Sequence, residues 1–199
     1  MTSMTSLTRQ YAAALRLLLA LTVLLGVVYP AVVFGVGRLG LSARADGSLV
    51  EHDGKVVGSS LLGQSFTGDR WFHGRPSTSD YSGDTSGGSN LAASSDAQAK
   101  AVAERRATVA QADGGAGTSR GAGGIPADAL TASASGLDPH ISPEYAALQV
   151  PRVARATGLG TDLVASLVAK HTQGRTLGYL GEPRVNVLEL NLALARAAG

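Results

Sequence analysis

The longest feature of the hydrophobic pattern is an uncharged apolar run at Leu17–Gly37, near the start of the chain. As a helix it would measure roughly 31 Å at 1.5 Å per residue, close to the ~30 Å hydrocarbon core of a bilayer. A cleaved signal peptide is the alternative, since Ala43-Arg44-Ala45 has the small-residue pattern of a cleavage site. Its apolar core would be shorter, roughly 7–15 residues. We predict a transmembrane helix at 17–37, between a short N-terminal segment (1–16) and a soluble domain (38–199).

Tyr29 and Pro30 lie inside this run. A membrane helix tolerates proline when neighbouring helices or side chains satisfy the carbonyl that the proline leaves without a donor. The pair therefore predicts contact with partner helices, and Tyr29 and Pro30 are candidate partner contacts. Arginines flank both ends of the run, so the positive-inside rule does not fix its direction. The short N-terminal segment favours a soluble domain outside the cytoplasm.

After the apolar run the pattern changes from strand signals to helix signals. Two short alternating segments, 48–52 and 55–59, flank Asp53-Gly54, which predicts a hairpin with a type I′ turn. Ala97–Ala112 is rich in helix formers and follows Asp96, a predicted cap. Asp113–Gly124 is glycine-rich and predicts a mobile segment.

Three further helices are expected in the last third of the chain. Ser142-Pro143 opens one through about Gln149, where Pro151 interrupts it or starts another that ends before Gly158. Thr161 is expected to cap the next helix. Asn186 resembles a capping box with Glu189 and predicts a helix to Ala198, although alternating leucines at 188–194 also fit a strand. The predicted fold class is α+β, one soluble domain behind one transmembrane helix.

Composition removes several classes of function. The net charge is only +2 and no basic cluster stands out, so a nucleic-acid partner is not expected. The chain has no cysteine, which excludes disulfides, thiolate catalysis and cysteine-based zinc sites. The four histidines lack metal-ligand spacing, so no metal site is predicted.

Two catalytic patterns occur in the wrong context. Gly35–Gly40 matches G-x-G-x-x-G but leaves a membrane helix, whereas a dinucleotide loop must follow a strand. Gly117–Gly121 matches G-x-S-x-G around Ser119, but it lies in a glycine-rich spacer rather than a strained strand-to-helix turn. We predict no catalytic residue.

The segment Ser86-Gly87-Gly88-Ser89-Asn90 is the most informative loop. Its free backbone N–H groups and polar side chains could cradle a phosphate or another polar ligand. The same residue types also hold turns by side-chain hydrogen bonds, so a structural or partner-contact role stays open. Asp138-Pro139-His140 has the same two interpretations, an acid–base pair or a turn that precedes the next helix.

Several segments together resemble one family. They are Trp71–Ser77, Ser86–Leu91, Ser135–Pro143, Gln149–Val153, His171–Arg175 and Leu180–Asn191, in this order behind one membrane helix. The set resembles the C subunits of the bacterial Kdp potassium-transporting ATPases, and it covers essentially the whole chain.

The resemblance implies a non-catalytic accessory subunit of a high-affinity, ATP-driven potassium import complex in the bacterial cell membrane. Its partners would be a channel-like potassium-binding subunit, a catalytic P-type ATPase subunit and the lipid bilayer. The implied roles are to stabilise the assembly and to assist ATP binding, with ATP as a ligand attributed by the family alone. An extracytoplasmic domain would not meet cytoplasmic ATP, so this reasoning favours assembly over direct nucleotide contact.

The candidate residues follow from these interpretations. The nucleotide or polar-ligand candidates are Ser86, Gly87, Gly88, Ser89, Asn90 and Gln149, and the partner-contact candidates are Tyr29, Pro30, Arg75, Asp138 and Arg184. Two alternatives stay open: a membrane-anchored extracytoplasmic hydrolase that uses Asp138, His140 or Ser119, and a free-standing protein that binds a polar ligand.

Overall fold

The structure is a computed structural model that describes residues 4–114 and 124–199. The chain divides into two compact units, one ending at Ser48 and the other covering Leu49–Gly199. Most of the glycine-rich segment predicted at Asp113–Gly124, including Ser119, lies outside the described residues.

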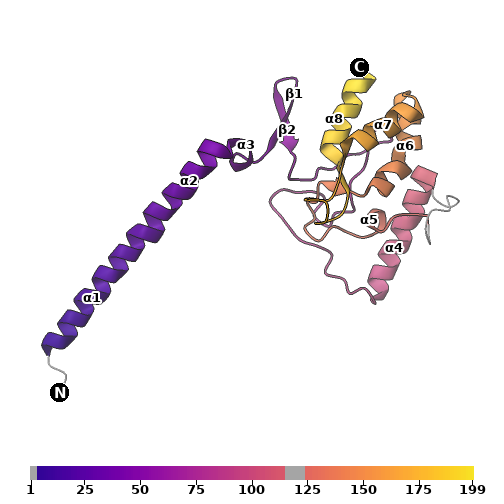
Figure 1. The fold of residues 1–199 in the computed structure, drawn as a ribbon. Helices are drawn as coiled ribbons and strands as arrows, with labels where there is room; N and C mark the ends of the chain where they lie inside the picture. The colour runs from indigo at the N-terminus through magenta and orange to yellow at the C-terminus, as the bar shows by residue number, and fades with distance from the viewer. Residues whose placement is uncertain (1–3, 115–123) are drawn as a thin grey trace. The chain divides into compact units, whose positions relative to one another are not determined.

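The first unit is dominated by one long apolar helix (Figure 1). It consists of α1 (Met4–Val23), a π-helical turn η1 (Leu24–Val28) and α2 (Tyr29–Gly40). A short helix, α3 (Ser42–Ala45), follows. The stretch Ser6–Gly40 is long and apolar enough to cross a membrane, and its most apolar window is unburied. The helix extends beyond 17–37 at both ends because alanine, leucine and arginine in the flanks are good helix formers.

The π-helical turn lies directly before Pro30. The backbone N–H of Tyr29 donates to the carbonyl of Leu24, five residues back instead of four. Proline has no N–H and its ring presses on the carbonyl four residues back, here Gly26. The wider turn relieves that pressure without ending the helix, which is a common use of π-helical turns.

The second unit begins with the predicted hairpin. β1 (Leu49–His52) pairs antiparallel with β2 (Lys55–Ser59), and the register shifts at Val50/Glu51. Asp53 and Gly54 have φ of 49° and 72°, as a type I′ turn requires. This prediction is confirmed.

A small antiparallel sheet and a set of helices form the rest of the domain. The strands β3 (His140–Ile141), β5 (Arg184–Asn186) and β4 (Thr172–Gln173) lie in the order β3-β5-β4. The helical elements are α4 (Asp96–Val109), the π-helical η2 (Ala110–Gly114), α5 (Ala127–Leu130), α6 (Pro143–Thr157), α7 (Thr161–His171) and α8 (Val187–Ala198). The α+β class is therefore confirmed.

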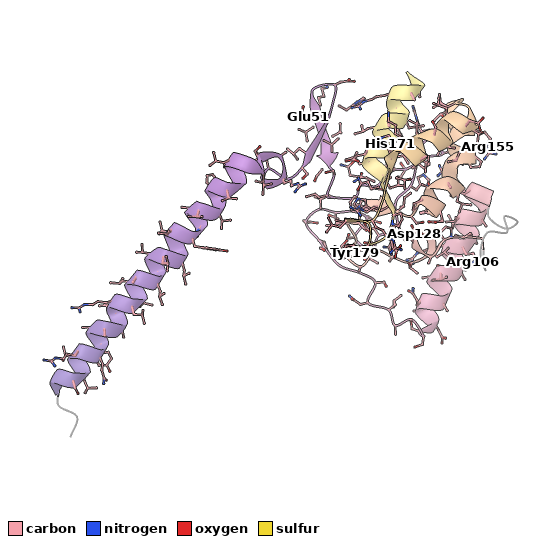
Figure 2. All side chains as sticks on the ribbon, in the orientation of Figure 1. Glu51, Arg106, Asp128, Arg155, His171 and Tyr179 are labelled. Atoms are coloured by element: carbon pink, nitrogen blue, oxygen red, sulfur yellow. The ribbon has the colours of Figure 1, made fainter. Side chains whose placement is uncertain are left out.

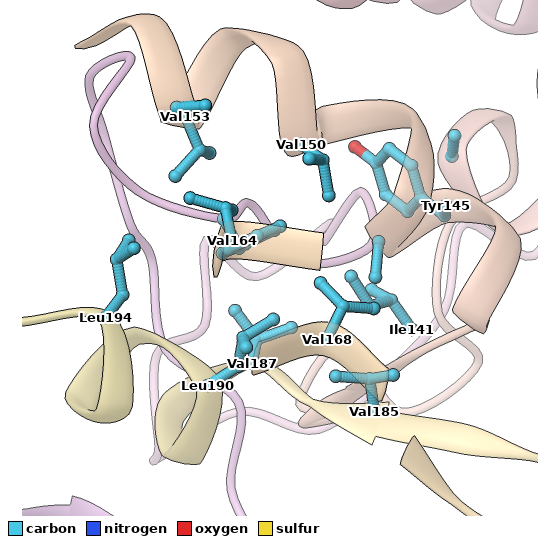
Figure 3. Close-up of a cluster of buried hydrophobic side chains, with 14 of the residues drawn as sticks. Ile141, Tyr145, Val150, Val153, Val164, Val168, Val185, Val187, Leu190 and Leu194 are labelled. Carbon is cyan, nitrogen blue, oxygen red and sulfur yellow. The ribbon is translucent and has the colours of Figure 1, made fainter. Parts of the chain in front are cut away.

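The core lies where α6, α7, α8 and β5 meet (Figure 3). Val153, Val164, Val185 and Leu190 are fully buried there, and Leu194 is 1% exposed. The helix prediction for 187–198 is confirmed and its strand alternative is wrong, because Asn186 Oδ1 accepts from the N–H of Glu189 and starts the helix.

Three local predictions are wrong. The cap of α4 is Ser95, whose Oγ accepts from the N–H of Gln98, and Asp96 is already helical. Gly160 occupies the cap position of α7 and provides no side-chain bond, so Thr161 is the first helical residue.

Pro151 is the third case, since it neither ends nor restarts the helix but lies inside α6. Pro151 and Ala147, whose carbonyl it leaves without a donor, are both exposed, so water can satisfy that carbonyl. Ser142 caps this helix by accepting from the N–H of Tyr145, and Gly158 ends it at φ 75°, both as predicted.

Candidate functional site

Two buried amides hold the aromatic segment at Trp71–His73. Asn191 Oδ1 accepts from the N–H of Phe72 at 2.9 Å, and its Nδ2 donates to the Phe72 carbonyl at 2.9 Å. Gln149 does the same for His73, accepting at 2.7 Å and donating at 3.1 Å. Each side-chain amide thus pairs with a backbone residue as a neighbouring strand would, and we call this arrangement the amide clamp.

Arg152 fixes the same segment from the next turn of α6. Its guanidinium donates to the carbonyls of Asp69 and Trp71 at 2.8 and 2.9 Å, and to Gln149 Oε1 at 2.8 Å. Its Nε donates to Asp113 Oδ1 at 2.6 Å, and the two side chains are 2% and 3% exposed. A buried cation needs hydrogen bonds to all of its donors, because the free-energy cost of removing it from water exceeds what one ion pair contributes.

The pKa of His73 reflects the burial and the charges of this region. Burial and the nearby Arg152 cation lower the pKa of His73 from its usual 6.5, although its bond to the Gly68 carbonyl opposes the shift. A neutral imidazole near neutral pH follows. No catalytic partner is needed to explain it.

Gln149, a predicted ligand residue, is therefore an internal structural group. It is fully buried, and its Oε1 accepts from both His73 and Arg152. Both lone pairs are in use, so in this structure it offers no acceptor to a ligand.

The first half of the polar loop is tied to the chain around Ser135. The N–H of Gly87 and the Oγ of Ser86 both donate to the Ser135 carbonyl, at 2.9 and 3.1 Å. Thr78 Oγ1 donates to the Gly87 carbonyl at 2.9 Å. A Cβ on Gly88 would come within 3.1 Å of the Ala134 carbonyl oxygen, so the absent side chain permits close backbone packing. These contacts match the structural interpretation of the loop.

The second half of the loop, Ser89 and Asn90, makes fewer hydrogen bonds. Ser89 Oγ accepts a long 3.5 Å bond from the N–H of Leu91, and Asn90 is exposed with φ 53°. Ser89 and Asn90 are the candidates of this loop that keep polar atoms available.

An open hollow of about 470 Å³ lies beside the loop. Its walls are formed by three segments far apart in the sequence: Leu61 and Leu62, Ser86, and the stretch 133–139. Ser86 is the polar-loop candidate that lines it, and Ser133 and Ser135 use their hydroxyls within the 133–137 turn. The hollow is mostly apolar and has no cluster of available phosphate donors.

Arg75 and Asp138 form an ion pair beside this hollow, and His140 is hydrogen-bonded to the same carboxylate. Arg75 Nη1 lies 3.2 Å from Asp138 Oδ2, and Asp138 Oδ1 accepts from the N–H of His140 at 3.0 Å. Burial opposes ionisation, but the His140 hydrogen bonds and the Arg75 charge outweigh it and lower the pKa of Asp138. Asp138 and His140 therefore lie together, Asp138 just before β3 and His140 as the first residue of that strand.

Tyr81 is hydrogen-bonded to the same group of residues. Its hydroxyl donates to the Arg75 carbonyl at 2.6 Å, and burial followed by the Asp138 charge raises the pKa of Tyr81 to about 12. A Cβ at Gly74 would collide with this hydroxyl, and one at Gly63 would come within 2.5 Å of the ring. The absence of side chains at Gly63 and Gly74 therefore leaves the space that the Tyr81 side chain fills.

The remaining candidates lie elsewhere. Arg184 is half-buried on β5, and Tyr29 is 62% exposed on the membrane helix next to Pro30. Ser119 of the hydrolase alternative is outside the described residues. Within residues 4–114 and 124–199 no group of three or more acidic or histidine side chains could hold a metal ion.

Sequence reasoning missed Asn191, Arg152 and Tyr81 as organising residues. Buried polar residues inside apolar helix faces were the available signal, since such groups are hydrogen-bonded almost without exception. Their partners could not be predicted, because those of the amide clamp lie 76 and 119 positions away in the chain.

Comparison with known proteins places the chain. A protein-family profile described as K⁺-transporting ATPase, c chain, matches residues 11–196. A potassium-transporting ATPase KdpC subunit of Kineococcus radiotolerans is 57% identical over 198 residues, 98% of each chain. Proteins of the same name from Gemmatimonas aurantiaca (52% identical; 91% of this chain, 89% of the relative) and Bradyrhizobium diazoefficiens (46%; 96% and 98%) also match. The profile spans most of the membrane helix and nearly all of the domain, and the chain therefore belongs to the KdpC family of potassium-transporting ATPase subunits.

Proposed function

We propose that this chain is a non-catalytic accessory subunit of an ATP-driven potassium import complex. Its helix would lie against membrane partners, a potassium-binding channel-like subunit and a catalytic P-type ATPase subunit. The observation that carries the proposal is the 57% identity to a named potassium-transporting ATPase subunit over 98% of both chains. An identity that high along the full length argues for a shared role as well as a shared fold.

The way this domain uses its polar groups supports a role without chemistry of its own. Arg152, Gln149 and Asn191 are 2% exposed or less and bind the chain's own backbone. Asp138 Oδ1 accepts from the backbone N–H of His140, the first residue of β3. Groups committed to the fold are poorly suited to take part in a reaction.

We further propose that the subunit stabilises the assembly and assists ATP binding by its partner. For assembly, Tyr29 and Pro30 next to the π-helical turn give the membrane helix an irregular surface that a partner helix can recognise. For nucleotide, Ser89 and Asn90 are the loop residues with polar atoms still available. Because the first half of the loop already uses its polar groups in hydrogen bonds within the domain, an indirect effect on ATP binding through assembly fits better than direct binding of phosphate by the loop.

The central experiment is affinity purification of the tagged full chain from potassium-starved cells. Two larger integral membrane subunits should copurify, and ATP hydrolysis should appear in the complex and be absent from the chain alone. Purification of the chain without membrane partners would overturn the subunit role. ATP hydrolysis by the chain alone would overturn the non-catalytic role.

A second experiment separates direct from indirect assistance. The Michaelis constant for ATP is measured on complexes with the wild-type chain, with Ser89→Ala/Asn90→Ala, and with Pro30→Leu. We expect the loop variant to leave the constant unchanged and the helix variant to lower the yield of intact complex. A raised constant in the loop variant with normal yield would mean direct contact with ATP.

The hydrolase alternative has one supporting observation, the 3.6 Å separation of His140 Nδ1 and Asp138 Oδ1. Measuring both potassium uptake and any hydrolase activity in His140→Ala decides between the two. Normal uptake with a lost hydrolase activity would favour the enzyme.

A further inference from the structure

Two arginines lie on one face of the membrane helix, just before its uncharged apolar run begins. Arg9 and Arg16 are both exposed, and both belong to α1. They are seven residues apart, which is almost two helical turns, so their side chains leave the helix on nearly the same face, about 10 Å apart along its axis. Ala12 and Ala13 lie between them on that face. The small alanines leave room for an anionic group between the two guanidinium groups.

The opposite face of the same segment is apolar. Leu7, Tyr11 and Leu15 follow one another at intervals of four residues and are 42%, 73% and 56% exposed. Figure 2 shows the side chains of this helix standing out along its length, and its most apolar window is unburied. Arginines on one face and large apolar side chains on the other are typical of helical segments at a membrane surface.

The length of the helix places the arginine face in the headgroup layer. The helical stretch Ser6–Gly40 has 35 residues and is about 52 Å long, whereas the hydrocarbon core measures about 30 Å and the whole bilayer about 40–45 Å. With Leu17–Gly37 in the core, Arg16 lies at the boundary of the core and Arg9 about 10 Å farther out. Long arginine side chains reach the lipid phosphates from such positions.

The charges of the chain leave these two arginines without an acidic partner. The first acidic residue in the sequence is Asp46. It lies 3.0 Å from Arg38, at the other end of the helix, and Arg38 also lies 5.4 Å from the centre of the Phe34 ring. Within residues 4–114 and 124–199, no ion pair includes Arg9 or Arg16. An anion from outside the chain is therefore needed to neutralise them.

We propose that Arg9 and Arg16 bind the phosphate groups of anionic phospholipids in the leaflet around the N-terminal end of the membrane helix. A guanidinium group recognises phosphate through two parallel hydrogen bonds, and phosphates surround a helix at this depth on every side that lipid covers. Each basic residue near an anionic membrane surface strengthens binding about fivefold. The inference goes beyond the proposed function, because it needs no partner subunit.

Native mass spectrometry of the purified full chain in a non-ionic detergent tests the proposal. Phosphatidylglycerol and phosphatidylcholine with the same acyl chains are added in equal amounts, and the bound molecules of each are counted. The variants are Arg16→Gln and Arg9→Gln/Arg16→Gln. The matched control is Arg38→Gln, because Arg16 and Arg38 directly flank the two ends of the same apolar run.

We expect the wild-type chain to prefer phosphatidylglycerol. Arg16→Gln should reduce this preference about fivefold and the double variant at least tenfold, whereas Arg38→Gln should change it less than twofold because Asp46 already neutralises that arginine. No preference in the wild-type chain, or equal losses from Arg16→Gln and Arg38→Gln, would overturn the proposal.

Two further measurements exclude other sources of the anion. Excess inorganic phosphate should leave the preference for phosphatidylglycerol unchanged, and competition by it would mean that the arginines take free phosphate instead of a lipid. Copurification of membrane subunits is compared between the wild-type chain and the double variant. Lost subunits with an unchanged lipid preference would mean that the arginines bind an acidic protein surface, and the lipid site would be wrong.

Discussion

Arg152 shows how a single residue can organise a domain from the inside. Its guanidinium has four acceptors: the backbone carbonyls of Asp69 and Trp71, and the side chains of Gln149 and Asp113. Removing the cation would leave the Asp113 carboxylate buried without its counter-charge. The loss of stability on removing Arg152 therefore includes the cost of this unpaired buried charge.

We expect Arg152→Ala to lower the free energy of unfolding by about 3–5 kcal/mol, the range for breaking a buried ion pair by removing one partner. Urea unfolding of the full chain in detergent, followed by fluorescence of the sole tryptophan, Trp71, measures it. Arg155→Ala, exposed on the same helix, is the control and should stay within about 0.5 kcal/mol of wild type. A loss no larger than that of the control would show that Asp113 is solvated.

Acid should destabilise the domain through His73. Because burial and Arg152 lower the pKa of His73 in the folded state, the unfolded chain binds more protons below pH 6.5. The free energy of unfolding should therefore fall as the pH drops from 6.5 toward the lower folded pKa, and should be unaffected by this group above 6.5. His73→Asn should flatten the pH dependence in that window, as followed by urea unfolding at several pH values. Equal slopes in both proteins would contradict the assignment.

At the scale of helices and strands, the features that could be predicted from the sequence are those set by residues adjacent in the chain. The Asp53-Gly54 turn, the Ser142 cap and the Asn186 cap are each set by residues within three positions, and all three are confirmed. The cap predicted at Asp96 is wrong by one position, because Ser95, a residue type that caps equally well, has the extended backbone and accepts the bond from the N–H of Gln98.

What the sequence could not predict depends on distant partners. Gln149 matched a family segment and was assigned to a ligand, but its partner is a backbone group 76 positions away. The polar loop 86–90 is likewise fixed by the Ser135 carbonyl, 49 positions from Ser86. Neither distance leaves a periodic or local pattern in the sequence.

Pro151 gives a test of element stability. Pro151→Ala would supply an N–H that can donate to the exposed Ala147 carbonyl, and alanine is the better helix former by about 3 kcal/mol. We expect the variant to be more stable by about 1–3 kcal/mol, measured as a raised melting temperature. Ala156→Gly, an exposed change in the same helix, should lower stability by about 1 kcal/mol. A less stable Pro151→Ala protein would mean that α6 depends on a proline-induced distortion.

For the whole molecule, the direction of the membrane helix decides which compartment the domain occupies. The chain has no cysteine, so single cysteines can be introduced without background. We expect Ser166→Cys, on exposed α7, to react with a membrane-impermeant maleimide in intact cells, and Gln10→Cys to react after permeabilisation only. The reverse result would place the domain in the cytoplasm, where contact with ATP becomes feasible.

The amide clamp also limits how early in synthesis the domain can fold. A ribosome makes Phe72 long before Asn191, and Ser60 long before Asn186, yet these residues bond to each other across 119 and 126 positions. Contacts at such separation form slowly, because much chain entropy is lost before they contribute. The bonds that α8 gives to the aromatic segment can therefore form only after Asn191 has been synthesised, 119 residues after Phe72.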